Sequence, residues 1–433
     1  MTNDTIFALS SGAPPAGVAV VRISGPAAGA ALEALAGPRP KSRRATLRVL
    51  RDPGAEPDAA ELDRALVLWL PGPTTATGED SAELHLHGGR AVIAAVLAAL
   101  ARVPSLRVAT PGEFTRRAFA NGRIDLAEAE GLADLLAAET ELQRRTAQAM
   151  AGGALSRQVE AWREAVLRLS AQVEAVLDFS DEGEVGEAMP SGFAAGARAL
   201  ADEIARWLAR PRAEPLREGL RVVIAGPPNA GKSTLFNALL ESETAITAPE
   251  AGTTRDVLRA PVALAGLPFV LIDTAGLRRD GAGAVEAIGI ARARAEARAA
   301  DLVLWLGAEG KGPVDAPLWE VDAQVDRADR PRKSPAAIAV SALTGEGIDP
   351  LRARLVEFAT AALPRPGDVA LNRRQHTLLA EVEQTLGQAA REGDPLLAAE
   401  GLRLARAALD ALVGRAGTEA MLDVLFGRFC IGK

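Results

Sequence analysis

The sequence is short of the residues that form disulfides and thiolate metal sites. Among its 433 residues there is one cysteine, Cys430, and no tyrosine. A single cysteine excludes an intrachain disulfide and any metal site that needs several thiolates. The chain also has no run of eighteen apolar residues, and its first residues, Met-Thr-Asn-Asp, lack a basic segment followed by an apolar core. We therefore expect a cytoplasmic protein that does not associate with a membrane.

Lysine is scarce as well. Only five of the 49 basic residues are lysines, at positions 41, 232, 311, 333 and 433. Because most basic residues are arginines, an arginine-rich stretch is weak support for RNA binding. A lysine in this chain is more informative, because a guanidinium does not replace a compact ammonium.

The net charge of −7 argues against broad, non-specific binding to nucleic acid. The length leaves room for two or three domains.

The most informative segment is a phosphate-binding motif. Residues 226–233 read Gly-Pro-Pro-Asn-Ala-Gly-Lys-Ser, which fits G-x-x-x-x-G-K-[ST], between an apolar run at 221–225 and a helix-like segment at 234–240. This strand–loop–helix setting is what the motif requires. Backbone N–H groups of such a loop face a phosphate chain, Lys232 reaches the β- and γ-phosphates, and the Ser233 hydroxyl ligates Mg²⁺. The segment predicts a nucleoside triphosphate site.

Two later segments narrow this prediction to a GTPase. Residues 273–276 read Asp-Thr-Ala-Gly and follow the apolar run 269–272, so Asp273 ends a strand, where it can hold the metal through water. The N–H of Gly276 can then meet the γ-phosphate. Between the two motifs, residues 252–256 read Gly-Thr-Thr-Arg-Asp. A switch loop at that place would bring a threonine hydroxyl to Mg²⁺.

The segment that would read the base is degenerate. GTPases usually present Asn-Lys-x-Asp after a strand, and the last Asp accepts hydrogen bonds from guanine. Here residues 323–326 read Ala-Gln-Val-Asp, and residues 326–329 read Asp-Arg-Ala-Asp. We favour Asp326 because residues 318–325 are the nearest strand-like run, and Asp329 stays open as the alternative. Since the usual Asn and Lys are missing, we expect weaker affinity for guanine. Ser341-Ala342-Leu343 fits the last loop on the guanine side.

Hydrolysis needs a stabiliser of developing charge and a group that orients water. Leu277 stands where Ras-like proteins place a water-orienting Gln. Asn229 lies inside the phosphate loop, in position to help hold a monovalent cation, and that cation would supply the charge that an arginine finger supplies elsewhere. Arg255, Arg278 and Glu286 are nearby switch candidates that also fit plain surface charges.

Three segments outside the phosphate loop are further candidates for functional sites. Residues 83–89 alternate so that Glu83, His85 and His87 share one strand face; the only other histidine is distant, so a polar ligand pocket or a solvated face fits better than a metal site. Residues 110–119 fit either a domain junction or an anion-binding corner. The apolar C-terminal segment 429–433 favours a docked, functional end over a frayed tail.

The character of the sequence changes along the chain. Residues 1–119 mix strand-like runs with a helix-like stretch at 90–103, which predicts an α+β domain. Long amphipathic patterns follow, for example over 124–150 and 155–177, and helical periodicity returns after 363. Residues 217–362 alternate strands and helices as an α/β P-loop GTPase domain does. We predict a multidomain chain in which that domain is inserted into one all-α helical domain with halves 120–216 and 363–433; two separate helical pieces are the alternative.

At these residues the chain resembles the MnmE family, also called TrmE, of bacterial tRNA-modifying GTPases, along essentially its whole length. Four features carry the resemblance: Gly-Val-Ala-Val-Val-Arg-Ile-Ser-Gly at 17–25, the segment 110–119, the GTPase motifs with 252–256, and the terminal Phe-Cys-Ile-Gly-Lys. The resemblance implies that residues 1–119 form a tetrahydrofolate-binding and dimerisation domain, that 217–362 form the inserted TrmE-type GTPase domain, and that the Cys-Ile-Gly-Lys motif closes the helical domain. The degenerate guanine motif departs from the family pattern.

The motifs and the resemblance together give a set of expected site residues. The expected catalytic residues are Lys232, Asp273, Arg278, Glu286 and Cys430. The expected GTP-binding residues are Asn229, Ala230, Gly231, Lys232, Ser233, Thr234, Ala248, Pro249, Glu250, Ala251, Gly252, Thr253, Thr254, Asp273, Thr274, Ala275, Gly276, Asp326, Ser341 and Ala342. Mg²⁺ would be held by Ser233 and Thr254, and K⁺ by Asn229, Ala248, Glu250 and Thr253. The folate-binding residues that the resemblance implies are Arg22, Glu83, Arg123 and Lys433.

The expected function follows from this resemblance. It implies a potassium-activated GTPase that works with the flavoprotein MnmG to add a carboxymethylaminomethyl group at C5 of the wobble uridine, position 34, of certain tRNAs. GTP would be the substrate, with K⁺, Mg²⁺ and a tetrahydrofolate one-carbon derivative as cofactors. FAD and NADH would belong to MnmG, since this chain has no G-x-G-x-x-G motif. The expected partners are a second copy of the chain, MnmG in a heterotetramer, and tRNA.

The alternative function is a non-catalytic GTPase switch in the assembly of ribosomes or ribonucleoproteins. An appended basic RNA-binding module would favour it. The sequence instead has a mixed N-terminal region and an apolar end.

Overall fold

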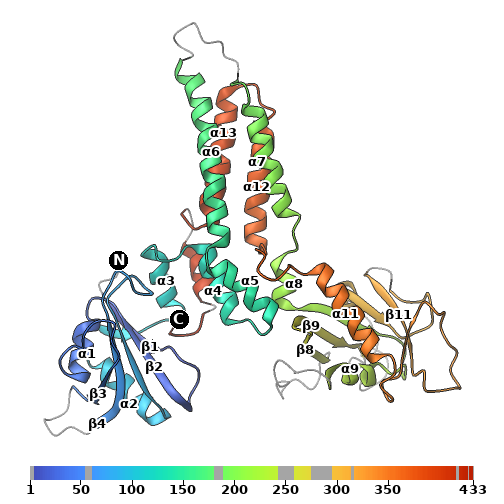
Figure 1. Ribbon diagram of the computed structural model, residues 1–433, viewed down its shortest axis with the longest axis horizontal. Helices are drawn as coiled ribbons and strands as arrows, with labels where there is room; N and C mark the ends of the chain where they lie inside the picture. Colours follow the sequence, from blue (N-terminus) through green and yellow to red (C-terminus); the bar gives the residue numbers. More distant parts are fainter. Residues whose placement is uncertain are drawn as a thin grey trace, which may run out of the picture. The chain divides into compact units, whose positions relative to one another are not determined.

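The structure is a computed structural model that describes residues 4–53, 61–179, 189–241, 258–274, 295–313, 316–415, 419–427 and 429–432. The chain divides into two compact units. The first comprises residues 1–133 with 410–433, and the second comprises residues 134–409. Figure 1 shows the elements of both units.

A six-stranded sheet organises the first unit, with the strand order β3-β4-β5-β2-β1-β6. The strands are β1 (Thr5–Leu9), β2 (Ala16–Ser24), β3 (Thr46–Arg51), β4 (Glu61–Leu70), β5 (Ser81–Gly88) and β6 (Leu106–Val108). Neighbouring strands are antiparallel, except that β1 and β6 are parallel. The strand-like runs expected from the sequence therefore lie in one sheet.

The two faces of this sheet have different roles because side chains alternate along a strand. In β4, Ala65, Val67 and Trp69 are buried while the residues between them are more exposed. Helices α1 (Ala28–Ala36) and α2 (Arg90–Ala101) pack against this buried face and complete one hydrophobic core with it. The other face stays available for polar side chains of β2 and β5.

The end of the chain folds back onto the first unit. Helix α3 (Glu113–Ala120) contacts α14 (Glu419–Phe426), and the rings of Phe119 and Phe426 lie 6.1 Å apart. Phe429 extends this cluster and is buried. Apolar burial therefore holds the C-terminal segment against the N-terminal residues of the same unit.

Long helices dominate one part of the second unit (Figure 1). They are α6 (Ala154–Phe179), α7 (Phe193–Leu208), α12 (Arg373–Ala389) and α13 (Pro395–Leu412). Helix α7 packs against both α6 and α12, and Gly401 of α13 lies against α12. In α6 the buried residues Leu155, Val159, Trp162 and Val166 recur every three or four positions, which is the spacing of one helix face.

The single amphipathic pattern expected over residues 124–150 is in fact two helices, α4 (Leu126–Leu136) and α5 (Glu141–Ala151). A capping box separates them. Thr140 accepts a hydrogen bond from the backbone of Gln143, and the Gln143 side chain accepts one from the backbone of Thr140. Such a box satisfies the first N–H groups of a new helix, so the chain restarts at α5.

The rest of the second unit is an α/β fold around a sheet with the order β12-β11-β10-β7-β9-β8. Its elements are β7 (Leu220–Ala225), α9 (Lys232–Leu240), β8 (Leu258–Leu264), β9 (Leu267–Asp273), β10 (Leu302–Trp305), β11 (Leu318–Ala323), β12 (Ile338–Val340) and α11 (Ile348–Ala362). Strand β8 is antiparallel to β9, and the other neighbouring pairs are parallel. Parallel strands bring their carboxyl ends to one edge, where such folds bind ligands.

Helical segments precede and follow this α/β fold along the chain. The chain enters it from α8 (Ala213–Glu218) and leaves through α11 into α12. The expected fold class is confirmed: an α+β N-terminal region, helical segments, and an α/β P-loop fold between them. The expected domain boundaries stay predictions. None of the helices in the part of the chain that the structure describes is long and apolar enough to cross a membrane.

Candidate nucleotide site

The phosphate loop, residues 226–233, connects β7 directly to α9. Gly226 has φ 156° and Gly231, the N-cap of α9, has φ 90°. A Cβ on Gly226 would meet the backbone of Leu306 and Gly307 at 3.2 Å, so this turn requires glycine. The loop therefore delivers the N-terminus of α9 to the carboxyl edge of the sheet, where its N–H groups can bind an anion.

Lys232 lies at the start of α9 and is only 6% exposed. Its ammonium donates a hydrogen bond to the carbonyl of Pro227 at 2.8 Å, across the loop. An ammonium held against the loop that would cradle the phosphates is placed to bind phosphate oxygens.

Ser233 of α9 and Asp273 at the end of β9 lie side by side at this edge of the sheet. In the parallel pairing, Ile224 of β7 lies opposite Asp273 of β9, which is fully buried. The Ser233 Oγ donates to Asp273 Oδ2 at 2.6 Å. A hydroxyl and a buried carboxylate side by side form the oxygen-donor set that suits Mg²⁺, so these residues fit the expected magnesium site.

Thr274 has a structural role in the same place. Its hydroxyl donates to the carbonyl of Ile224 at 3.0 Å and thereby ties the end of β9 to β7. The side chain is therefore turned toward the strands, and any contact of Thr274 with a nucleotide would come from its backbone.

A cavity of about 480 Å³ opens beside this loop. It is lined by Pro228, Asn229, Gly231, Lys232, Ser233, Thr234, Gln324 and Arg327. Five expected site residues thus share one cavity, and Ala230 of the same loop is fully buried. Asn229 has φ 60°, a left-handed conformation that a non-glycine residue seldom adopts and that often marks functional sites.

The structure separates the two candidates for the guanine acceptor. Asp326 accepts a hydrogen bond from the hydroxyl of Ser341 at 2.6 Å, and Ser341 is fully buried next to the expected Ala342. Asp329 instead forms a two-point ion pair with Arg327, whose hydrogen bond lowers the pKa of that carboxyl. Asp326 is hydrogen-bonded to the second guanine-side segment, whereas Asp329 is paired with Arg327. The geometry therefore supports Asp326 as the residue that accepts hydrogen bonds from guanine.

The expected folate residues lie in the first unit. Arg22 and Glu83 face each other across β2 and β5, and their side chains form an ion pair at 3.0 Å. His85 adds a hydrogen bond to Glu83 at 3.2 Å. Arg123 follows α3, and its side chain lies against Gly78. Arg22, Glu83 and His85 thus form one polar group on the outward face of the sheet, as the alternating pattern predicts.

The C-terminal residues lie at the end of β1. The Ser10 hydroxyl donates to the carbonyl of Gly432 at 2.8 Å, and a Cβ on Gly432 would run into the carbonyl of Leu9. Cys430 is exposed, and its carbonyl accepts a hydrogen bond from the backbone of Gly112 at 3.5 Å. The segment 429–432 is therefore docked. Its functional role stays a prediction.

Several expected site residues lie outside the described residues. They are Ala248, Pro249, Glu250, Ala251, Gly252, Thr253, Thr254, Ala275, Gly276, Arg278, Glu286 and Lys433. The magnesium and potassium ligands expected from the switch segment are among them, so the structure places one expected ligand of each ion, Ser233 and Asn229.

Sequence reasoning missed Gln324 and Arg327 as site residues. Both line the phosphate-loop cavity. Gln324 occupies the second position of the degenerate guanine motif, and Arg327 directly follows Asp326. Their position in or next to that motif is the sequence feature from which their place in the nucleotide site could have been predicted.

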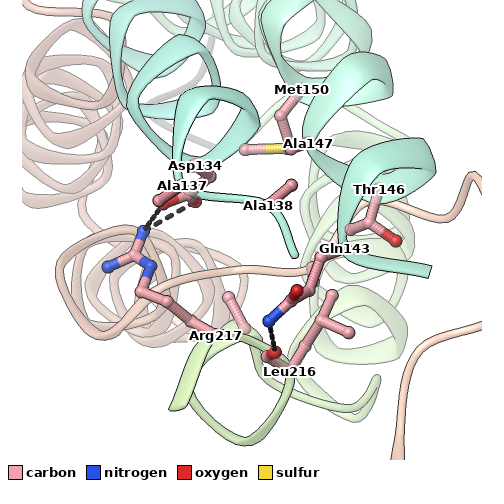
Figure 2. A pocket seen from close by; sticks show the side chains of 11 residues that line it. Asp134, Ala137, Ala138, Gln143, Thr146, Ala147, Met150, Leu216 and Arg217 are labelled. Atoms are coloured by element: carbon pink, nitrogen blue, oxygen red, sulfur yellow. Dashed lines mark hydrogen bonds and ion pairs between the residues drawn. The ribbon is translucent and has the colours of Figure 1, made fainter. Parts of the chain in front are cut away.

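A second, smaller cavity of about 60 Å³ is lined by residues of α4, α5 and α8, by the α4–α5 connection and by Ala370 (Figure 2). Two polar contacts flank it: Arg217 pairs with Asp134 at 2.6 Å, and the Gln143 side chain donates to the carbonyl of Leu216 at 2.9 Å. Leu142 of α5 is part of the core of the α/β fold. Helix α5 is thus packed onto the fold that holds the phosphate loop.

Comparisons with known proteins agree with this geometry. A family model described as the MnmE helical domain matches residues 126–430, and one described as the N-terminus of the GTP-binding protein TrmE matches residues 5–123. A protein of Novosphingobium aromaticivorans named tRNA modification GTPase MnmE is 66% identical over 100% of both chains. A protein of the same name from Erythrobacter litoralis is 63% identical over 99% of this chain and 100% of its own.

Among solved structures, Era of Aquifex aeolicus bound to GDP and AlF4⁻ is 23% identical, with a TM-score of 0.26 over 38% of this chain and 66% of that one. The full-length relatives and the two family models are decisive. This chain belongs to the MnmE/TrmE family.

Proposed function

We propose that this chain is a GTPase that acts in tRNA modification. The observation that carries the proposal is the convergence of Lys232, Ser233 and Asp273 at one sheet edge, beside a cavity formed by the phosphate loop. The relatives that match the whole chain bear the name tRNA modification GTPase.

The loop amides and Lys232 bind the β- and γ-phosphates, and Asp326 accepts hydrogen bonds from the guanine edge. Ser233 and Asp273 would hold Mg²⁺, and Asn229 would contribute a ligand to K⁺. Bound there, the two cations would supply positive charge where the phosphate oxygens gain negative charge. Water attacks the γ-phosphate in line, and Lys232 stays with the phosphates throughout.

The modification proposal extends beyond the GTPase site. Together with MnmG, the chain installs carboxymethylaminomethyl at C5 of the wobble uridine of certain tRNAs. It works as a cytoplasmic homodimer formed through its N-terminal domain, and FAD and NADH act on MnmG. Arg22, Glu83 and Arg123 bind the tetrahydrofolate derivative that carries the one-carbon unit. The paired charges of Arg22 and Glu83, which are partly buried on this sheet face, support a polar ligand at that place.

The modification proposal is tested in a bacterial strain that lacks its own MnmE. The chain and its Lys232→Ala variant are expressed there, and wobble-uridine modification is measured by mass spectrometry of digested tRNA. We expect the chain to restore the modification and the variant to fail. Unmodified tRNA in cells that hold the soluble, GTP-hydrolysing chain would contradict the proposal.

The cation proposal is tested by measuring GTP turnover in KCl and in NaCl at equal ionic strength. Charge supplied by K⁺ predicts turnover at least about tenfold faster in KCl. Equal rates in the two salts would refute a role for Asn229 in binding K⁺ while leaving GTP binding intact.

A further inference from the structure

Gln324 joins the two loops that form the nucleotide cavity. It stands in the guanine motif at the position where GTPases usually have lysine. Its Nε2 donates to the carbonyl of Asn229 in the phosphate loop at 3.3 Å. A Cβ on Gly231 would meet the same amide nitrogen at 3.0 Å, so the amide also lies against the second glycine of that loop.

The orientation of the Gln324 amide is fixed by its second partner. Arg330 Nη1 donates to Gln324 Oε1 at 2.7 Å. Because a guanidinium only donates hydrogen bonds, the group that it contacts must be the amide oxygen. The NH₂ group is then the one that faces the carbonyl of Asn229.

Both residues that form this contact have a left-handed backbone conformation. Gln324 has φ 61° and Asn229 has φ 60°. Asparagine adopts this left-handed conformation more readily than other non-glycine residues, whereas glutamine seldom does, and such a conformation persists where the surroundings impose it. The hydrogen bond to the phosphate loop is one of the contacts that hold Gln324 in this conformation.

We propose that Gln324 is a nucleotide-positioning residue that replaces the usual lysine and fastens the base-side loop, residues 324–330, to the phosphate loop at Asn229. This inference rests on the proposed GTPase function. The contact holds Asp326 and the phosphate loop at one fixed separation, so the base and the phosphates bind together. Since Asn229 is also the proposed potassium ligand, Gln324 sets the position of that ligand as well.

The test uses the full chain, with GDP titrated by calorimetry in KCl and with the K⁺ dependence of GTP hydrolysis. Gln324→Ala is expected to raise the Kd for GDP about five- to tenfold and to raise the K⁺ concentration that gives half-maximal turnover. Gln324→Lys is expected to rescue both quantities to within about twofold of the parent chain, since an ammonium can donate to the Asn229 carbonyl. A role in folding alone would not shift the K⁺ requirement.

Two further variants keep the result decisive. Arg330→Met removes the group that orients the amide and is expected to raise the Kd for GDP about two- to threefold, so it decides the matter if Gln324→Ala does not fold. Gln388→Ala makes the same truncation on an exposed part of α12 and is expected to change neither quantity.

The binding measurements distinguish a wrong role for Gln324 from a wrong GTPase function. If Gln324→Ala binds GDP as the parent chain does and has the same K⁺ requirement, the role of Gln324 is overturned and the GTPase function stands. If the parent chain itself binds no GDP, the proposed function is overturned along with it.

Discussion

Ser233 at the start of α9 donates a hydrogen bond to Asp273 at the end of β9, with 2.6 Å between Oγ and Oδ2. The two residues are 40 positions apart in the sequence, and the parallel pairing of β7 with β9 brings them together. The oxygen atoms of this pair define the place where Mg²⁺ would meet the phosphates.

Replacing Ser233 with alanine should reduce GTP hydrolysis about 100-fold or more, because it removes a magnesium ligand beside the phosphates. The measurement is the turnover of GTP at saturating Mg²⁺. Ser42→Ala changes an exposed serine of the first unit and serves as the control. Turnover of Ser233→Ala within twofold of the parent chain would remove Ser233 from the metal site.

Asp326 and Asp329 provide a matched pair for base recognition. Asp326→Asn should weaken GTP binding by at least about tenfold, because the amide presents a donor to the donor edge of guanine. The same variant should gain affinity for xanthosine triphosphate, which carries an acceptor at that edge. Asp329→Asn, which disrupts only the exposed pair with Arg327, should leave both affinities nearly unchanged. Both affinities are measured by competition binding. If Asp329→Asn changed them and Asp326→Asn did not, Asp329 would be the residue that recognises the base.

Glu113 should stabilise the first unit at neutral pH. Burial by itself would raise its pKa, but hydrogen bonds from Arg107, the Thr110 backbone and Arg117 prevail and lower the pKa from 4.5 to about 2. A lowered pKa in the folded state gives stability that is present above pH 4.5 and is lost as the pH falls toward 2. We expect a contribution on the order of 3 kcal/mol for this side chain, which is 10% exposed, because one pKa unit corresponds to about 1.4 kcal/mol.

Hydrogen exchange of the β1 and β6 amides in the full chain checks this prediction. Glu113→Gln should lower their protection at pH 7, and the difference from the parent chain should shrink below pH 4. Glu141→Gln is the control. Hydrogen bonds from Arg144 and Arg145 lower the pKa of Glu141 to about 2 as well, but the pairs are exposed and solvent screens them. Protection that is unchanged in Glu113→Gln at pH 7 would contradict the account.

Gly432→Ala should release the C-terminal segment, because a Cβ there would run into the carbonyl of Leu9 and because φ is 96°. If the docked segment serves tRNA modification, the variant should lose that modification in cells and keep its GTP turnover. Gly393→Ala, where a Cβ has open space, should keep both. Full modification by Gly432→Ala would mean that docking of the segment is dispensable.

The structural features that were predicted correctly from the sequence are those formed by residues close together in the chain. The phosphate loop, the strand before it and helix α9 are contiguous, so their motif and setting were sufficient. The polar face of β5 followed from simple alternation. The break between α4 and α5 near Thr140 was not predicted, because the apolar periodicity continues through it. The capping box formed by Thr140 and Gln143 starts a new helix there in spite of that periodicity.

Contacts between distant residues decided what the sequence left open. Asp326 is distinguished from Asp329 by Ser341, which is 15 positions away. The link from Gln324 to Asn229 spans 95 positions, and the docking of Gly432 on Ser10 spans 422. A one-dimensional pattern carries no information about such pairs until the strand order is known.

Nucleotide binding by the phosphate loop is measured by a calorimetric titration of the chain with GTP and Mg²⁺ in KCl, compared with the Lys232→Ala variant. We expect one GTP site per chain, with binding abolished or weakened at least about 100-fold in the variant. Absence of GTP binding by the parent chain, or equal binding by the two proteins, would rule out this nucleotide site.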